Sequence, residues 1–321
     1  MSVIFQNIEF HNVEELVKKE KGWAMKRIPT AVGEGLDEGA GELTCFYSTG
    51  VELRFRMLQE SVVIRLRVDE EMEAQTAFIY FGSFQGGWRD SSRAVGTQET
   101  KIVITRPDNM ETLKGVSMEK GLPFRPEVVR LVLPYGKCYF CGAEGELAPP
   151  RPEDLPERTY LAYGSSITHG SLALAAPYTY PFRISRMLGC DYCNMGFAGS
   201  AHLEKRMAEY IVSRKDWDFA SVEMGINMLG EDFDDALFEE RVREFVEILG
   251  RDARPVFATS IFGIMGPERE IVKAERFRNI VKKHAEGKLI FTDGLELLDN
   301  SAYISQDMTH PTLEGLSLIH I

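Results

Sequence analysis

Residues 158–170 read RTYLAYGSSITHG, an apolar run that passes directly into a polar turn with glycines on both sides. The run RTYLAYG (158–164) predicts a buried strand, because it is short, rich in apolar and aromatic residues, and bounded by turn residues. A helix is predicted to follow at Tyr180–Leu188. This order of strand, turn and helix sets the pattern for the C-terminal half of the chain.

The alternation of strands and helices continues to residue 294. Further strands are predicted at CDYCNMGF (190–197), FASVEMG (219–225), PVFATSIF (255–262) and KLIFTDG (288–294), and further helices at 202–214, 236–249 and 267–285. Such alternation predicts a parallel sheet with right-handed crossovers and helices on both faces, a three-layer α/β/α domain. In such sheets the functional site lies beyond the carboxyl ends of the strands.

The N-terminal half is richer in short strands. They are predicted at 52–58, 61–68, 77–82, 101–105 and 128–134. In SVVIRLRV (61–68) apolar residues alternate with polar ones, which is typical of a strand with one buried face. The pattern predicts an all-β sandwich of the jelly-roll kind at residues 1–148. The proline-rich composition around 149–157 predicts a linker, after which the α/β domain covers 158–321.

Composition and charge narrow the classes of partner. The chain has 321 residues, a formal net charge of −12 and a pI of about 5.1. An acidic surface repels phosphate backbones and anionic lipids, so neither nucleic acid nor membrane is expected as a partner. The sequence shows no apolar run of about 18 residues and no signal-peptide pattern. We therefore expect a cytoplasmic protein, and a homo-oligomer is compatible with the sequence.

Five cysteines include two CxxC pairs, Cys138 with Cys141 and Cys190 with Cys193. Two such pairs can build a four-cysteine zinc site. However, CDYCNMGF is predicted as a strand, in which residues three apart point to opposite faces and cannot share one metal ion. Buried reduced thiols are the plainer interpretation, and neither a metal nor a cofactor is expected.

The turn GSSITHG (164–170) admits several interpretations. A phosphate-binding loop would need a lysine after Gly170, and the dinucleotide pattern of three glycines is also absent. The nucleophile elbow GxSxG would need a glycine two residues after Ser166, where Thr168 stands. A serine nucleophile remains, provided that the fold brings a base close to Ser166.

Two histidines are candidates for that base. His169 follows Ser166 by about one helical turn, and we expect it at the surface or rim of the site. His310 follows the last predicted strand, in SQDMTHPTLEG, with Asp307 three residues before it. A carboxylate at this spacing can accept the Nδ1–H of the imidazole and leave Nε2 free to take a serine proton. The D-x-x-H pattern alone is common, but its place beyond a strand end favours His310.

Acyl transfer also needs hydrogen-bond donors for a developing oxyanion. Gly199 follows the strand predicted at 190–197, where a bare backbone N–H can approach a substrate. Asn227 follows the strand predicted at 219–225, where its side-chain amide can donate. Glycine and asparagine are also ordinary turn residues, so each position alone is compatible with turn chemistry.

Taken in order, these four strand-end motifs resemble the SGNH (GDSL-like) hydrolase family, over residues 158–315. The resemblance implies that Ser166 is the nucleophile, His310 the base and Asp307 the acid that orients it. It also implies an oxyanion hole formed by the backbone N–H groups of Ser166 and Gly199 and the side chain of Asn227. With the N-terminal β domain, the chain is similar to two-domain carbohydrate esterases and related acyltransferases.

The sequence departs from the family pattern at two positions. Ser165 stands where the G-D-S motif has Asp, which leaves the implied triad intact but alters the turn. Met228 stands where Asp often follows G-x-N, and from this we expect a more apolar rim. Met228, His202 and Phe262 are candidate substrate contacts.

The resemblance implies a serine esterase that removes short acyl groups, acetyl first, from a small carbohydrate. Acyl transfer to another small-molecule acceptor by the same triad is the alternative, and a non-catalytic sugar-binding protein is a third. Phe84 and Trp88 can stack on a sugar, although we expect them to pack within the sandwich.

The final residues LSLIHI (316–321) resemble translated adapter sequence. We therefore expect the natural chain to differ after about Gly315, and the last helix to be too short to cover the core well.

Overall fold

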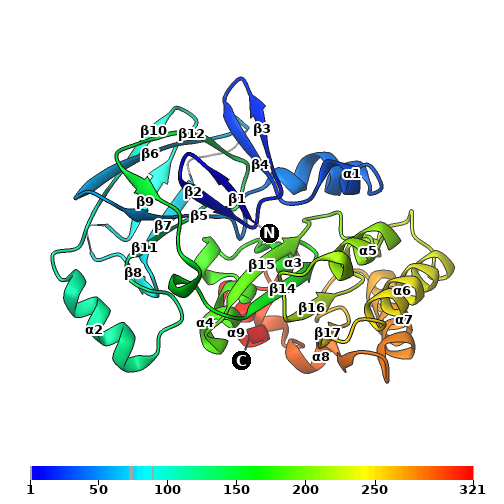
Figure 1. The fold of residues 1–321 in the computed structure, drawn as a ribbon. Helices are drawn as coiled ribbons and strands as arrows, with labels where there is room; N and C mark the ends of the chain where they lie inside the picture. The colour runs from blue at the N-terminus through cyan, green and yellow to red at the C-terminus, as the bar shows by residue number, and fades with distance from the viewer. Residues whose placement is uncertain (1, 72–74, 89, 321) are drawn as a thin grey trace.

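The computed structural model describes residues 2–71, 75–88 and 90–320 and has two halves of different architecture (Figure 1). Two antiparallel sheets form the N-terminal half, and a parallel sheet with helices on both faces forms the C-terminal half. The predicted fold, an all-β sandwich followed by a three-layer α/β/α domain, is confirmed. No helix among the described residues is long and apolar enough to span a membrane.

The first antiparallel sheet has the order β1-β2-β5-β11-β7-β8, with β13 beside β5 and β9 beside β7. Its strands are β1 (Ser2–Phe5), β2 (Ile8–His11), β5 (Glu52–Met57), β7 (Gln75–Phe81), β8 (Phe84–Gln85), β9 (Ser92–Val95), β11 (Val128–Val132) and β13 (Leu147–Ala148). The second has the order β10-β6-β12-β4-β3. Its strands are β3 (Glu15–Lys19), β4 (Gly22–Lys26), β6 (Ser61–Val68), β10 (Thr100–Thr105) and β12 (Cys138–Glu144).

These two sheets enclose one apolar core. Alternate residues of β6 are buried, including Ile64 and Leu66, and they pack with Leu53 and Phe55 of β5 in the facing sheet. The alternation of apolar and polar residues along β6 therefore decides which face of this strand is buried, as the sequence predicts.

The parallel sheet has the order β15-β14-β16-β17-β18, so β15 is an edge strand. Its strands are β14 (Thr159–Gly164), β15 (Asp191–Gly196), β16 (Phe219–Glu223), β17 (Val256–Thr259) and β18 (Ile290–Thr292). The helices of the chain are α1 (Thr30–Gly33), α2 (Met110–Lys120), α3 (Ser166–His169), α4 (Tyr180–Leu188), α5 (Lys205–Ser213), α6 (Asp235–Leu249), α7 (Glu268–Ala285), α8 (Gly294–Leu297) and α9 (Leu313–His320).

Successive residues of β14 pack against different helices. Leu161 and Tyr163 lie in a cluster with residues of α5, α6 and α7, whereas Tyr160 and Ala162 pack with Phe182 of α4. Because successive side chains of a strand point to opposite faces, one short apolar run supplies the core on both sides of the sheet.

Several N-terminal elements were not predicted from the sequence. The strands β1 to β4 have four or five residues each, and α2 has little segregation of apolar residues to one side. The stretch 149–157, expected as a linker, is packed rather than free. Asp154 is buried, and its carbonyl oxygen accepts a hydrogen bond of 3.0 Å from the Arg125 N–H.

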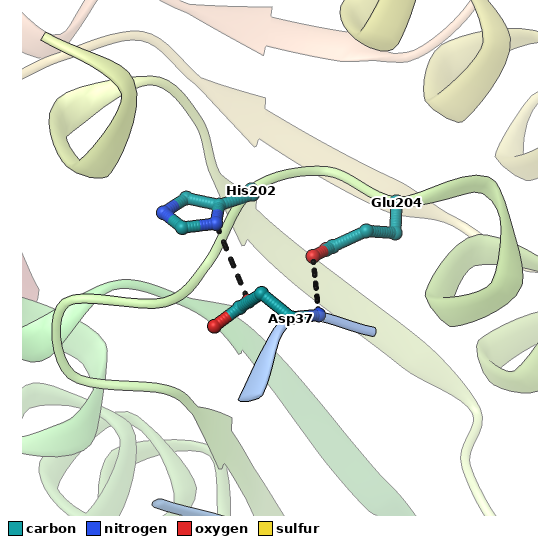
Figure 2. A group of neighbouring side chains, drawn as sticks. All are labelled: Asp37, His202 and Glu204. Carbon is teal, nitrogen blue, oxygen red and sulfur yellow. Dashed lines mark hydrogen bonds and ion pairs between the residues drawn. The ribbon is translucent and has the colours of Figure 1, made fainter. Parts of the chain in front are cut away.

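The N-terminal half caps the open edge of β15. Three donors reach its outward carbonyl oxygens: His11 Nε2 donates to Tyr192 at 2.6 Å, and Asn12 Nδ2 and Arg27 Nη1 donate to Asn194 at 3.0 and 2.8 Å. The edge of a sheet otherwise exposes unpaired backbone groups. Further along the same interface, Asp37 lies beside His202 and Glu204, which follow β15 (Figure 2).

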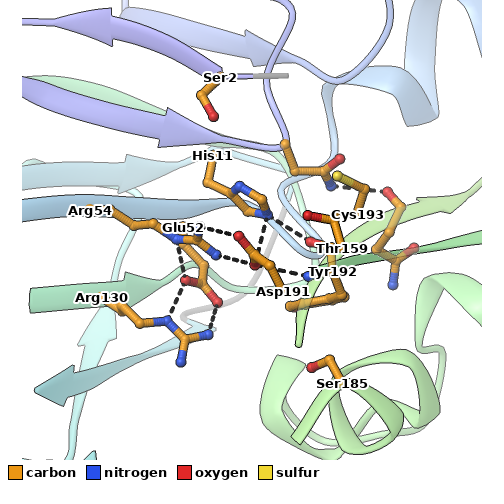
Figure 3. Close-up of polar contacts among 12 residues, drawn as sticks. Ser2, His11, Glu52, Arg54, Arg130, Thr159, Ser185, Asp191, Tyr192 and Cys193 are labelled. Carbon is orange, nitrogen blue, oxygen red and sulfur yellow. Dashed lines mark hydrogen bonds and ion pairs between the residues drawn. The ribbon is translucent and has the colours of Figure 1, made fainter. Parts of the chain in front are cut away.

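A buried network of charges joins the two halves below this edge (Figure 3). Arg54 of β5 forms two hydrogen bonds of 2.6 Å with the carboxylate of Asp191 at the start of β15. Arg54 also contacts Glu52 at 2.8 Å, and Arg130 of β11 contacts Glu52 at 2.6 and 2.7 Å. All four side chains are at least nine-tenths buried, so their charges are balanced within the protein.

The sheet face beside α9 is only partly covered. A groove of about 470 Å³ is lined there by apolar side chains that include Phe219, Phe257 and Ile319. The end of α9 borders this groove through Ile319 and His320. The expectation that the natural chain differs after about Gly315 stays a prediction.

Replacing Arg54 by Met is expected to lower the free energy of unfolding by about 3–5 kcal/mol at pH 7, because it leaves buried carboxylates without their partner. Burial opposes ionisation of Glu52, but the charges of Arg130 and Arg54 outweigh it and lower its pKa from 4.5 to about 2. The stability that this lowered pKa contributes is present above pH 4.5 and is lost as the pH falls towards about 2. Urea unfolding of the wild type and of Arg54→Met should show that their difference in the free energy of unfolding becomes smaller as the pH falls across this range.

A matched control is Arg276→Met, which removes an exposed ion pair with Asp235. Exposed pairs contribute little, so this variant should unfold like the wild type at every pH. A difference between Arg54→Met and wild type that stayed constant from neutral pH to pH 2 would contradict the assignment of the charges.

Candidate active site

Ser166, His310 and Asp307 come together at the carboxyl end of the parallel sheet. Ser166 is the first residue of α3, directly after β14, and its Oγ lies 2.7 Å from His310 Nε2. His310 Nδ1 lies 2.8 Å from Asp307 Oδ2. Because a carboxylate can only accept, Nδ1 carries the proton and Nε2 is the acceptor that faces the serine hydroxyl.

The loop before His310 keeps Asp307 ionised. Burial opposes ionisation, but hydrogen bonds from the N–H groups of His310 and Thr309 and from the Ser305 hydroxyl lower the pKa of Asp307 well below its usual range. These three donors all reach Oδ1, which leaves Oδ2 for the imidazole. Met308, between the acid and the base, has φ of 65°, an uncommon conformation that is found often at functional loops.

The two predicted oxyanion donors follow β15 and β16, the two strands that flank β14 in the sheet. Gly164 pairs with Gly196, so the turn at Ser166 and the loop that holds Gly199 leave the sheet side by side. Gly199 has φ of 74°, and a Cβ there would meet no described atom within 4 Å, which indicates an open backbone. Asn227 Oδ1 accepts the Ala201 N–H at 3.1 Å, so the amide nitrogen of Asn227 is left to donate.

The loop after β15 is held by the N-terminal half. His202 Nδ1 lies 3.3 Å from Asp37 Oδ2, and the Asp37 N–H donates to Glu204 Oε1 at 3.4 Å (Figure 2). Burial favours the neutral imidazole, but the hydrogen bond and charge of Asp37 raise the pKa of His202. The loop that carries Gly199 therefore depends on contacts with residues that precede it by more than 150 positions in the sequence.

The same group has the donor types that suit a divalent cation. Among the described residues, Asp37, His202 and Glu204 place one ligand atom each within 4.8 Å of one another. Their contacts with each other already use one imidazole nitrogen and one oxygen of each carboxylate, so the group is accounted for as an ion pair with a hydrogen bond. All five cysteines are free thiols, and Cys138 and Cys193 are fully buried.

His169 does not lie at the rim of the site, so that expectation is wrong. Its side chain is fully buried, with its ring centroid 4.3 Å from that of Tyr135 and 5.5 Å from that of Tyr47. Burial, together with the charge of Arg27, lowers the pKa of His169 well below its usual range. His169 is thus a neutral core residue, because the last residue of α3 packs against Tyr47 and Tyr135 of the N-terminal half.

Two of the three candidate substrate contacts are buried, and their role in substrate binding stays a prediction. Met228 is fully buried in the core beside α6, so it forms no apolar rim, and Phe262 is buried with Ile167 and Leu316. His202 keeps part of its side chain exposed and packs on Phe233 at 4.8 Å.

The exposure of the aromatic pair differs from expectation as well. Trp88 is 100% exposed, so it does not pack within the sandwich, whereas Phe84 is partly buried in β8.

One polar residue near the nucleophile was missed by the sequence reasoning. Glu223 ends β16 and is fully buried, with its carboxylate against Ser165. A signal was present in FASVEMG (219–225), because a glutamate inside a buried apolar strand needs polar partners.

Comparison with known proteins adds to this geometry. A model of the GDSL-like lipase/acylhydrolase family matches residues 162–317. A salicylyl-acyltransferase from a tetracycline biosynthetic pathway has a similar structure, with a TM-score of 0.72, 17% identity, and coverage of 100% of this chain and 94% of that one. A family two carbohydrate esterase from Clostridium thermocellum, in complex with cellohexaose, has a TM-score of 0.55 and 13% identity. The match covers 84% of this chain and 88% of that one.

A third similar structure is an acetyl xylan esterase from the rumen bacterium Butyrivibrio proteoclasticus, with a TM-score of 0.52 and 15% identity over 86% of this chain and 89% of that one. No match was found among curated protein sequences. The TM-scores and coverages of these three structures show a shared fold that extends over both halves of the chain. The family match begins within β14 and ends beyond His310, which confirms the resemblance drawn from the four motifs: residues 162–317 of this chain match the GDSL-like lipase/acylhydrolase family.

Proposed function

We propose that this protein is a serine esterase that hydrolyses short acyl esters, acetyl first, on a small carbohydrate. The observation that carries the proposal is the continuous path of hydrogen bonds from Ser166 through His310 to Asp307. A hydroxyl, an imidazole of defined tautomer and an ionised carboxylate in this order are the parts of a nucleophilic acyl-transfer site.

In the first step, Ser166 Oγ attacks the ester carbonyl carbon while His310 Nε2 takes the hydroxyl proton. The Asp307 carboxylate stabilises the imidazolium that forms. The negative charge that develops on the carbonyl oxygen is met by the N–H groups of Ser166 and Gly199 and by the amide nitrogen of Asn227.

In the second step, the carbon–oxygen bond to the alcohol breaks, and His310 returns the proton to the departing oxygen. The acyl group is then bonded to Ser166. Water, activated by the neutral imidazole of His310, releases the acid and restores the free hydroxyl.

Support for a carbohydrate substrate comes from the shared two-domain fold. Two of the similar structures are a carbohydrate esterase in complex with cellohexaose and an acetyl xylan esterase. The similar salicylyl-acyltransferase gives the second candidate, transfer of the acyl group to an acceptor other than water by the same three residues.

The triad predicts a specific order among three variants. Ser166→Ala and His310→Ala should each abolish turnover of p-nitrophenyl acetate and reaction with a fluorophosphonate probe. His169→Phe, which keeps an aromatic ring in the core contact with Tyr135, should retain the turnover number of the folded protein. Loss of activity in His169→Phe with retention in His310→Ala would move the base to His169.

The oxyanion assignment predicts a smaller loss. Asn227→Ala should lower kcat by about 10²–10³-fold with little change in KM, because the amide acts on charge that develops in the transition state. Steady-state kinetics with p-nitrophenyl acetate measure both constants. An equal loss in Asn227→Asp would agree, since that side chain keeps the acceptor for Ala201 but removes the N–H donor. Full activity in either variant would contradict the assignment.

Hydrolysis and transfer are separated by their products. Acetylated sugars and p-nitrophenyl esters of increasing acyl length are incubated with the wild type and with Ser166→Ala, with and without a sugar or amine acceptor. A hydrolase releases free acid at a rate independent of the acceptor. An acyltransferase forms the acylated acceptor, and its consumption of ester rises with acceptor concentration. A wild type that consumes no ester and reacts with no probe would leave a binding protein and contradict the proposal.

A further inference from the structure

A buried carboxylate lies directly beneath the nucleophile turn. Glu223, the last residue of β16, is 1% exposed, and its Oε2 accepts the Ser165 N–H at 2.8 Å and the Ser165 hydroxyl at 2.6 Å. The Thr168 hydroxyl lies 3.3 Å from the same oxygen. Three donors that converge on one oxygen fit an ionised carboxylate, which can only accept.

Ser165 transmits this contact to Ser166. Its hydroxyl donates to Glu223 and accepts the Ile167 N–H at 3.1 Å, so it caps the N-terminus of α3, the helix that begins with Ser166. An N-cap side chain fixes the first turn of a helix. The position of the Ser166 hydroxyl therefore depends on a side chain that is held in turn by Glu223.

The space around the turn is limited to this arrangement. A Cβ on Gly164 would lie 2.2 Å from Thr168 Oγ1 and 2.6 Å from Glu223 Oε2. Glycine at this position lets the carboxylate come under the chain between β14 and α3. The donors to Glu223 come from Ser165 and Thr168, so the Ser166 hydroxyl is left to contact His310 Nε2 at 2.7 Å.

Stability alone is a poor explanation for this glutamate. Its Oε1 has no hydrogen-bond partner among the described residues, and the groups that reach Oε2 are neutral. A buried carboxylate without a cationic partner costs free energy that an apolar residue would not. Burial raises the pKa of Glu223, and the hydrogen bonds from Ser165 and Thr168 offset this only in part.

We propose that Glu223 is a positioning residue of the nucleophile: through Ser165 it fixes the first turn of α3 and so the direction of the Ser166 hydroxyl. The inference rests on the proposed esterase function and deepens it. It assigns a role to a residue on a strand that contributes none of the three residues of the triad.

The central experiment moves the carboxylate from the strand to the turn. Glu223→Gln should lower kcat about 10–100-fold, the loss expected for one hydrogen bond to a charged group, with KM changed less than about twofold. Ser165→Asp alone should be at least as impaired, because it places two carboxylates in contact. The double variant Ser165→Asp/Glu223→Gln restores one carboxylate in hydrogen-bond reach of an amide and should recover kcat to within about threefold of wild type.

Ser221→Ala is the matched control for damage to β16. Ser221 lies two residues before Glu223 on the same strand, and its hydroxyl contacts the Tyr160 hydroxyl rather than Glu223 or Ser165. This variant should keep the wild-type kcat. Active sites are counted in every variant by titration with a fluorophosphonate, and folding is followed by circular dichroism, so that kcat refers to folded protein only.

Each outcome decides the proposal. Recovery of kcat in the double variant supports the proposal. If Glu223 were only structural, the losses of kcat in the two single variants would add in the double variant. An unchanged kcat in Glu223→Gln, or a double variant no better than its worse parent, overturns it. If Glu223→Gln does not fold, Ser165→Ala tests the same path and should lower kcat with KM unchanged. A wild type that is inactive towards every ester and unreactive with the probe overturns the proposed function itself. An active wild type whose kcat is unchanged in Glu223→Gln overturns this inference alone.

Discussion

The architecture depends on one buried guanidinium. Arg27 follows β4 in the N-terminal half, is fully buried, and donates to four carbonyl oxygens, each at 2.8 Å: those of Thr44 and Tyr47 in its own half and those of Asn194 and Gly196 on the open edge of β15. Burial lowers the pKa of Arg27 to about 10, which still leaves the group charged at neutral pH. A planar fork of donors suits this task, because one side chain can satisfy carbonyls of two halves at once.

This edge contact connects the β sandwich to the chemistry of the other domain. β15 ends at Gly196, and the loop that follows carries Gly199 and positions Ala201 against the side chain of Asn227. The contacts of Asp37 with His202 and Glu204 hold the same loop. The N-terminal half thus holds the loop that carries Gly199, one of the predicted oxyanion donors, although none of its residues belongs to the predicted triad.

The sequence carried enough to predict the fold and the three central side chains, because both follow from local rules. Runs of apolar residues gave the strands, and Ser166 and Asp307 with His310 follow strand ends. The misassigned residues fail for a common reason: whether a loop residue faces solvent is decided by packing partners far away in the chain. His169 is buried by Tyr47 and Tyr135, which precede it by 122 and 34 residues.

The capped edge of β15 also has a consequence for the order in which the chain folds. The N-terminal half leaves the ribosome first, and it can close its sandwich before β15 has been made. When the parallel sheet forms, its outward carbonyls meet side chains that are already in place, of which Asn12 and Arg27 are two. A C-terminal half made without the sandwich would expose the edge of β15 to other copies of the chain. The sandwich is therefore expected to prevent association through this edge during synthesis.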